Sequence, residues 1–335
     1  IQNEIIAVMA HQVQRDIIQD IGLNFFSIIA DEYTDISNQE QLTICLRWID
    51  EQMEAHEDFL GFYNIPNIQS DTIVHVIKDT FIRLQLSLSN CRGQCYDGAS
   101  NMLGKKSGVA KKIQECQPKA HATHCHGHAL SLSVKDATNH SKILSDTMSN
   151  TSEVVKLIKY SPKREHLLGD VKSNLVEEDE AAGLTKFSAT RWTVRAVCFQ
   201  RVLDNYEALL ELWEQCLQAE PKLDREVRGR VIGCKAQMKT FDFFFGLHIG
   251  KRIFSHTDNL SETLQKASMS AASGQYNAKL TTEVLKNIRK DDSFKSFYQT
   301  VLHKRASHPE ISEPQLQRKR KAPTRFEDGS GSHFY

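Results

Sequence analysis

The sequence predicts an α/β protein in which a mixed β-sheet unit is followed by a long all-α segment. Short apolar runs separated by polar turns dominate residues 23–138, as expected for strands. Two of these runs end at an aspartate, Asp31 and Asp97, where a strand would hand over to a turn. After about residue 130 the apolar side chains recur every three or four positions instead, which indicates helices.

Composition limits the classes of protein to which the chain can belong. With 335 residues, 40% of them hydrophobic and 25% charged, it is typical of soluble globular proteins. Its 42 basic and 42 acidic residues cancel, so a nucleic-acid surface would have to be a local patch. No apolar run approaches the ~20 residues of a membrane span, and no signal peptide opens the sequence. We therefore expect no membrane association.

The cysteines and the first residue give two further expectations. Eight irregularly spaced cysteines fit the reduced thiols of the cytosol or nucleus better than a disulfide framework. The first residue, Ile1, is not a methionine, which suggests a fragment or a processed chain.

The elements expected in the first part follow a defined order. Residues 1–22 form an amphipathic helix, since their apolar side chains recur at helical spacing. Three strands joined by short polar connections then suit an antiparallel meander. These strands are expected at Phe25–Asp31, Leu42–Ile49 and Phe59–Asn64. Next come a helix from Asp71, a strand at Cys91–Asp97, a helix from Asn101 that includes Val109 and Ile113, and a strand at Ala120–Cys125.

The resulting order, β-β-β-α-β-α-β, is the one that an RNase H-like fold requires. In that fold the first and fourth strands lie side by side and carry acids at their ends. An ordinary doubly wound fold would alternate strand and helix from the start, so the opening meander argues against it.

Asp31 and Asp97 are the candidate metal ligands. The carboxyl ends of strands in an open α/β sheet form the crevice where ligands bind, so acids placed there face solvent and substrate. If the two strands are parallel neighbours, both carboxylates can bind one Mg²⁺, a hard cation that prefers oxygen ligands. The alternative is that each aspartate only caps a turn, which is a common role of this residue.

The second part is predicted to be helical. Periodic segments are found at Ile143–Tyr160, Val194–Leu217, Val231–Phe245 and Thr281–His303. We assign residues 139–311 to a helical domain and residues 312–335 to a basic tail that is expected to be disordered. The basic run from Arg318 to Lys321 in this tail fits a nuclear localisation signal, a phosphate-binding arm or a solvated loop.

A histidine-rich stretch from His121 to His128 contains residue types that bind zinc. Structural zinc sites commonly use two separated ligand pairs, and the sequence offers no second pair with suitable spacing, so we do not expect zinc. Instead, Cys125 and His128 are expected to close the last strand. The thiol would pack inward and the imidazole would form hydrogen bonds near the acids, so that both residues support the acids without binding metal.

Arg191 and Trp192 form a candidate DNA contact within the helical part. A tryptophan can stack on a base while a neighbouring guanidinium holds a phosphate, which is useful where a nucleotide leaves its duplex. The alternative is a core tryptophan with an arginine that extends to the surface.

Four ordered motifs together resemble the hAT superfamily of transposases. They are Asp31-Glu-Tyr-Thr-Asp35, the stretch from Cys91 to Met102, the stretch from His124 to Leu132, and Ser188-Ala-Thr-Arg-Trp192. Within that superfamily the chain is most similar to the zinc finger MYM-type protein 1-like group (DUF4371), which residues 236–245 and 256–265 also resemble. The resemblance covers nearly the whole chain.

The resemblance implies an RNase H-like core interrupted by a long helical insertion. Asp31 and Asp97 would be the first two acids of a DDE triad, with Mg²⁺ or Mn²⁺ as the cofactor. Cys125 and His128 match the family's Cys-x-x-His motif, and Trp192 matches the tryptophan that handles a flipped base at the transposon end. The implied partners are transposon-end DNA and further copies of the full-length protein, in the nucleus.

Two departures from the family pattern change the expected activity. Tyr33 stands where related sequences usually carry a small hydroxyl residue, and it is expected to crowd the first acid. The family's third acid, a glutamate after the insertion, has no assigned counterpart, because Glu262 and Glu283 lie in insertion-like sequence.

We therefore expect a transposase-derived chain. Its ancestral strand cleavage and transfer would be inactive without the third acid and the C-terminal dimerisation region. The alternative is a domesticated, non-enzymatic nuclear module that binds DNA or protein.

Overall fold

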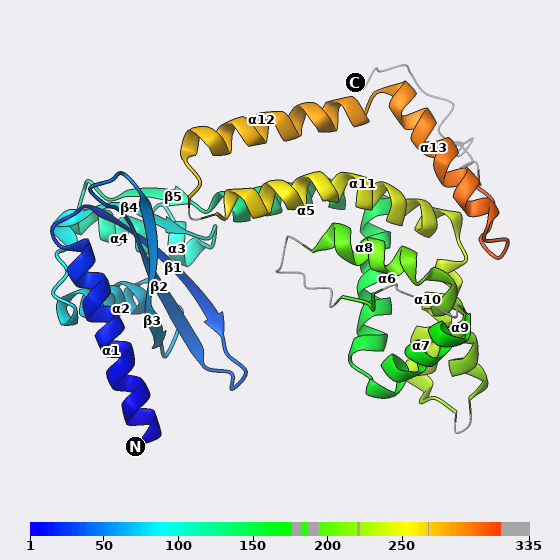
Figure 1. Cartoon of the computed structure of the whole chain (residues 1–335), viewed down its shortest axis with the longest axis horizontal. Coiled ribbons are helices and arrows are strands. Elements are labelled where there is room, and N and C mark those ends of the chain that lie inside the picture. The colour runs from blue at the N-terminus through cyan, green and yellow to red at the C-terminus, as the bar shows by residue number, and fades with distance from the viewer. Residues whose placement is uncertain (176–181, 186–193, 220–221, 267, 316–335) are drawn as a thin grey trace, which may run out of the picture.

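A computed structural model describes residues 1–175, 182–185, 194–219, 222–266 and 268–315. It consists of a five-stranded sheet with its own helices and a larger group of helices (Figure 1). The helices α5 (His126–Asn139) and α11 (Phe241–Leu264) lie side by side between the two groups. The α/β class predicted from the sequence is confirmed.

The sheet has the strand order β3-β2-β1-β4-β5 and mixed polarity. Strand β1 pairs antiparallel with β2 and parallel with β4, while β2 and β3 pair antiparallel and β4 and β5 pair parallel. The predicted meander and the predicted contact between the first and fourth strands are therefore confirmed. The strands are β1 (Phe26–Thr34), β2 (Glu40–Ile49), β3 (Ala55–Asn64), β4 (Cys91–Tyr96) and β5 (His121–His124).

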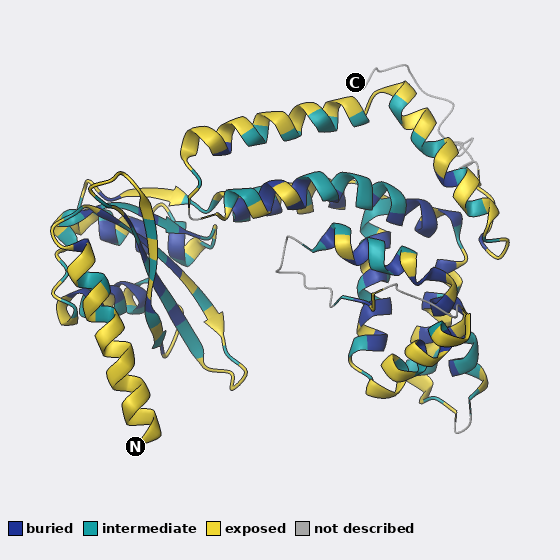
Figure 2. Ribbon diagram, in the orientation of Figure 1, coloured by how far each residue is buried: buried dark blue, intermediate teal, exposed yellow. Residues whose placement is uncertain are grey.

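One face of the sheet packs against the helices of its own unit. Strand alternation sends Phe26 and Ile28 of β1 into this core, where both are almost fully buried, and turns Ile29 and Asp31 to the opposite face. Most of α1 stays exposed, and only its last turns pack on the sheet (Figure 2). The helices of this unit are α1 (Gln2–Ile21), α2 (Ser70–Arg83), the short η1 (Leu88–Asn90), α3 (Ser100–Leu103) and α4 (Val109–Cys116).

The remaining helices enclose a second hydrophobic core. The aromatic first half of α11 and the fully buried Trp213 of α9 lie at its centre, and the Trp213 indole N–H donates to the Met238 sulfur at 3.3 Å. Within the described residues, no helix is long and apolar enough to cross a membrane. The helices of this unit are α6 (Lys142–Lys159), α7 (Pro162–Leu175), α8 (Arg195–Asp204), α9 (Tyr206–Gln218), α10 (Arg225–Met238), α12 (Ala271–Ile288) and α13 (Asp291–Ala306).

Several helix boundaries predicted from periodicity are wrong. The helix expected from Asn101 is two helices, α3 and α4, separated by a turn. The other three corrections have the same form: Val194–Leu217 contains α8 and α9, Val231–Phe245 spans the end of α10 and the start of α11, and Thr281–His303 spans parts of α12 and α13. Apolar spacing continues across the breaks between α3 and α4, α8 and α9, and α10 and α11 because in each pair both helices pack into the same core. The helices α5 and α7 were not predicted at all.

The predicted tail begins within the second unit. The Ser312 backbone N–H donates to the Lys239 carbonyl at 2.8 Å, and the Ser312 hydroxyl accepts from the Phe241 N–H at 3.1 Å. The basic run from Arg318 to Lys321 lies outside the described residues.

Candidate functional site

Asp31 and Asp97 lie level with each other on neighbouring parallel strands. The last registered pair of β1 and β4 is Ile29 with Cys95, and each aspartate follows two residues further along its strand. An even step keeps each side chain on the same face as the preceding pair, so both carboxylates project from the face that the sheet helices leave open. The Asp97 carboxylate also accepts a hydrogen bond from the Ala99 backbone N–H at 3.0 Å, which fixes its orientation.

The Asp31 carboxyl group is electrostatically crowded. Partial burial, followed by repulsion from Asp97, Glu32 and the Cys125 thiolate, raises the pKa of Asp31 from 3.8 to about 6. The repulsion from Asp97 agrees with the strand register in placing the two acids together. A cation between them would relieve this repulsion.

A third carboxylate, that of Glu32, lies near the acid pair. The interpretation of the sequence gave it no role. Partial burial is the main cause that raises its pKa, and Asp97 contributes by repulsion. Its side chain accepts a hydrogen bond from the Asn101 amide, which also donates to the Ile68 carbonyl at 2.9 Å. The sequence signal for this position was that Glu32 directly follows Asp31 at a strand end. Strand alternation sends two adjacent side chains to opposite faces of the sheet.

Cys125 lies at the end of the next strand, beside the acid pair. Its backbone N–H donates to the Tyr96 carbonyl at 2.8 Å, which extends the pairing of β4 and β5 by one residue. The Cys95 thiol donates to the Cys125 sulfur, and this bond, with the Gly127 and His128 backbone N–H groups, lowers the pKa of Cys125 to about 5. The same bond, with burial, raises the pKa of Cys95.

The expectation that Cys125 and His128 close the last strand is wrong in its details. Strand β5 ends at His124, and the Cys125 carbonyl accepts the Ala129 N–H at 2.9 Å, which begins α5. His128 therefore lies in the first turn of a helix, with its ring 5.5 Å from that of His124. The two residues nevertheless stay close together, because the His128 backbone N–H in the first turn of α5 bonds to the sulfur of Cys125, the N-cap residue of the helix.

The other predicted site, Arg191 and Trp192, lies outside the described residues. The helix that follows them, α8, begins at Arg195, which is buried and donates to the Ser131 hydroxyl of α5 at 3.3 Å. Asp258 of α11 accepts the Ala196 N–H at 2.8 Å. The start of α8 is thus fixed against both connecting helices.

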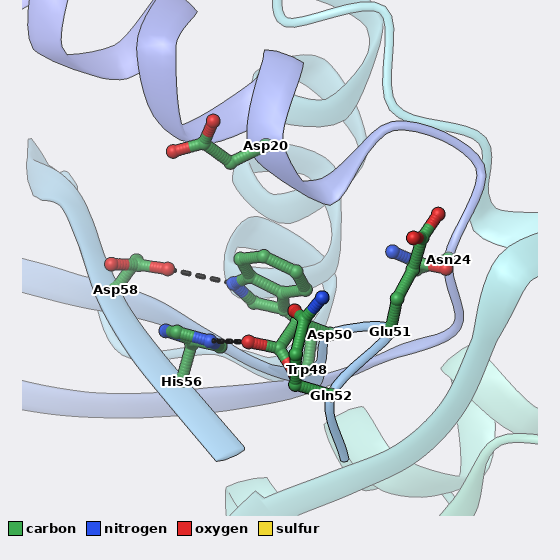
Figure 3. Close-up of a pocket in the computed structure, with 8 residues that line it drawn as sticks. All are labelled: Asp20, Asn24, Trp48, Asp50, Glu51, Gln52, His56 and Asp58. Atoms are coloured by element: carbon green, nitrogen blue, oxygen red, sulfur yellow. Dashed lines mark hydrogen bonds and ion pairs between the residues drawn. The ribbon is translucent and has the colours of Figure 1, made fainter. Parts of the chain in front are cut away.

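A polar pocket of about 350 Å³ lies near the opposite end of β1 (Figure 3). The Trp48 indole N–H donates to Asp58 at 2.7 Å and its ring stacks on His56, whose Nε2 lies 2.7 Å from an Asp50 oxygen. Because Trp48 pairs with Phe26, the first residue of β1, the pocket is separate from the acid pair. The residues that line it are Asp20, Asn24, Trp48, Asp50, Glu51, Gln52, His56 and Asp58.

The acid pair offers some, but not all, of the ligands that a hard cation needs. Two carboxylates are oxygen donors of the kind that Mg²⁺ and Mn²⁺ prefer, and Mg²⁺ often keeps several waters beside one or two protein carboxylates. Within the described part of the chain, no group of three or more histidine, cysteine, aspartate or glutamate side chains is arranged to hold a metal ion. Asp31 and Asp97 would therefore supply two carboxylate ligands, and the described residues bring no third side chain of these types to them.

Comparisons with known proteins support the family prediction. A human relative named "52 kDa repressor of the inhibitor of the protein kinase" is 26% identical over 298 residues, which are 86% of this chain and 39% of the relative. The mouse protein of the same name is 27% identical over 248 residues, or 72% of this chain and 32% of the relative. The chain thus spans less than two fifths of the length of these curated relatives.

The sheet unit also matches a described domain family. Residues 1–108, which include α1, the meander, β4 and Asp97, match the family "DUF4371: ZMYM1/FAM200, RNase-like domain". This match, the observed strand order and the paired acids agree with one another. Residues 1–108 are thus similar to the ZMYM1/FAM200 group of RNase-like domains.

Proposed function

We propose that this chain is the RNase H-like part of a hAT-type, transposase-derived protein that acts on DNA in the nucleus. The observation that carries the proposal is the acid pair: Asp31 and Asp97 lie level on adjacent parallel strands, and their mutual repulsion helps to raise the pKa of Asp31. The match of residues 1–108 to an RNase-like domain family supports it.

In the proposed site Asp31 and Asp97 hold Mg²⁺ or Mn²⁺. When bound, such ions supply an activated water or 3′-hydroxyl and stabilise the leaving oxygen during strand cleavage. The backbone of β1 and β4 positions the two carboxylates, and the Ala99 N–H holds one Asp97 oxygen in place. The Cys125 thiolate adds negative charge beside Asp31, which favours a cation at this point.

The proposed cleavage activity of this chain alone is weak. Two acids leave the ion with fewer protein ligands than the three acids of a DDE triad. Arg191 and Trp192 remain the predicted contacts to a flipped base, and transposon-end DNA and further copies of the full-length protein remain the predicted partners.

A second candidate function is a domesticated binding module without catalysis. Two observations favour it: the described residues complete no group of three metal ligands, and the two curated relatives are named as a repressor. In that case the sheet unit would bind DNA or a protein partner with the same surface and would not cleave a strand.

The metal site is tested by titrating Mn²⁺ into the chain and two variants. Asp31→Asn and Asp97→Asn should each weaken Mn²⁺ binding by at least about tenfold, because loss even of residues that only support a metal ligand costs roughly 10- to 100-fold. Asp136→Asn is the matched control, since Asp136 lies on the surface of α5 with a side chain that is 78% exposed. Equal affinities in all four proteins would overturn the proposed site.

Nicking of a supercoiled plasmid in Mn²⁺ then separates the two candidate functions. Nicking that Asp31→Asn abolishes supports the enzyme. DNA binding without any nicking, in a chain that still binds Mn²⁺, supports the binding module.

A further inference from the structure

We propose that Tyr33, Phe59 and Phe62 form a stacking surface for the bases of an unpaired DNA strand that leads to the acid pair. This inference rests on the proposed function, because it takes DNA as the substrate of the neighbouring acids. We call these three residues the aromatic row.

The strand register places the aromatic row on the same face as Asp31. Asp31 lies opposite Thr43 of β2, and Thr43 lies opposite Phe62 of β3, so the three side chains cross the sheet in one line. Two strand spacings of ~4.8 Å put the Phe62 backbone about 10 Å from that of Asp31. Tyr33 follows Asp31 by two residues on β1 and therefore points to the same face.

A β-bulge completes the aromatic row. Phe59 and Phe62 are three residues apart, so regular alternation would send them to opposite faces of the sheet. The register of β2 and β3 shifts between Ile44 and Cys45, so that Phe59 lies opposite Cys45 and Phe62 opposite Thr43. The two rings contact each other at 4.9 Å between centroids, and the Tyr33 ring lies 5.9 Å from that of Phe62.

All three rings of the aromatic row are exposed to solvent in the described part of the chain. Their exposed fractions are 48% for Tyr33, 47% for Phe59 and 60% for Phe62, whereas Leu60, on the other face of β3, is 2% exposed. A contiguous group of exposed large apolar side chains usually marks a binding surface. The contact of the Tyr33 ring with that of Phe62 joins the three side chains into one group.

The chemistry of the aromatic row favours a nucleic-acid strand over a protein partner. The exposed apolar side chains of α1 are aliphatic, as in many protein contacts, whereas the three side chains of the aromatic row offer flat faces to bases. Between the rings, β2 presents Thr43, whose hydroxyl suits a base edge better than an apolar helix, and Gln41, whose amide also donates to the Asp35 carboxylate at 3.1 Å. A fully paired duplex has no free base faces, so the substrate of this surface is an unpaired strand.

The test measures binding of fluorescently labelled oligothymidylate and of a blunt DNA duplex by anisotropy, with a chelator present so that the metal site plays no part. Phe62→Ala and Tyr33→Ala should each weaken binding of the single strand by about 5- to 150-fold. Duplex binding should change little, and Phe62→Trp should retain single-strand affinity because it keeps an aromatic face. The matched control is Tyr276→Ala, which removes a 67% exposed aromatic ring from α12.

Three results would overturn the inference: no measurable single-strand binding by the unchanged chain, an equal loss in Tyr276→Ala, or unchanged affinity in Phe62→Ala. If Phe62→Ala instead abolishes self-association in sedimentation while single-strand affinity stays the same, the aromatic row is a protein contact and the inference fails. Mn²⁺ affinity of Asp31→Asn tests the proposed function, whereas the single-strand affinities of Phe62→Ala and Tyr33→Ala in chelator test the aromatic row, so the two proposals can fail separately.

Discussion

Asp31 and Glu32 are neighbours in the sequence, yet strand alternation gives them different surroundings. Asp31 faces Asp97 across the gap between β1 and β4, whereas Glu32 bonds to Asn101. The sequence was sufficient to locate the two aspartates, because an acid directly after a short apolar run marks a strand end.

The neighbours of these acids were harder to predict. The bond from Cys95 to Cys125 depends on the pairing of β4 with β5, and the contact of Tyr33 with Phe62 depends on a bulge. Neither the pairing partner nor a bulge leaves a clear mark in one sequence, so these contacts required the structure.

In the metal-free protein we expect the Asp31 carboxyl to titrate at a pKa of about 6, well above its ordinary value of 3.8. Asp97→Asn should lower this pKa, since it removes the repulsion but leaves the partial burial in place. The folded state holds the Asp31 proton to higher pH than the unfolded chain does, so this group makes the protein less stable as pH rises between about 4 and 6.

Carboxyl-detected NMR checks this titration directly. An Asp31 pKa near 3.8, or one that Asp97→Asn leaves unchanged, would show that the two acids do not interact. Asp136→Asn serves again as the control and should leave the Asp31 titration unchanged.

At the scale of whole elements, the strands were predicted more reliably than the helices. Three separate apolar runs with polar turns between them leave few alternatives to a meander, and the ends of the observed strands differ from the predicted ones by only a few residues. Helix breaks were missed where a turn preserves the apolar spacing. The clearest is the turn between α3 and α4, where a side chain on Gly104 would lie 2.2 Å from the Ser100 carbonyl oxygen. The two glycines that frame Lys105-Lys106-Ser107 were the signal for this break.

The contact of β1 with β4 depends on the absence of a side chain at Gly93. A Cβ atom there would lie 2.5 Å from the Ser27 hydroxyl oxygen. Gly93→Ala should therefore lower the free energy of unfolding by about 1–3 kcal/mol, the usual cost of overpacking. Gly169→Ala is the control, because nothing lies within 4 Å of a Cβ atom at that position in α7, and it should stabilise the helix by about 0.5–1 kcal/mol. Urea denaturation measures the free energy of unfolding of both variants. An unchanged free energy of unfolding in Gly93→Ala would contradict the close packing of the two strands that position the acids.

In the whole molecule, a few contacts between residues far apart in the sequence link the helical unit to the sheet. Helix α5 begins at the acid pair and runs along α11, and Gly127 in its first turn packs against Gln265 at the end of α11. Arg47 of β2 donates to the Met269 carbonyl at 3.2 Å, which adds a second link. The sequence predicted a helical unit after the sheet, but these links join residues more than a hundred positions apart and have no periodic pattern that would reveal them.

Asp31 and Asp97 are proposed to hold one cation at the carboxyl ends of β1 and β4. The most direct measurement is anomalous diffraction from crystals of this chain soaked in Mn²⁺. A peak in contact with both carboxylates is expected, and it should disappear in Asp97→Asn crystals. A structure without a peak there, or with Mn²⁺ bound only in the acidic pocket beside Asp50 and Asp58, would contradict it.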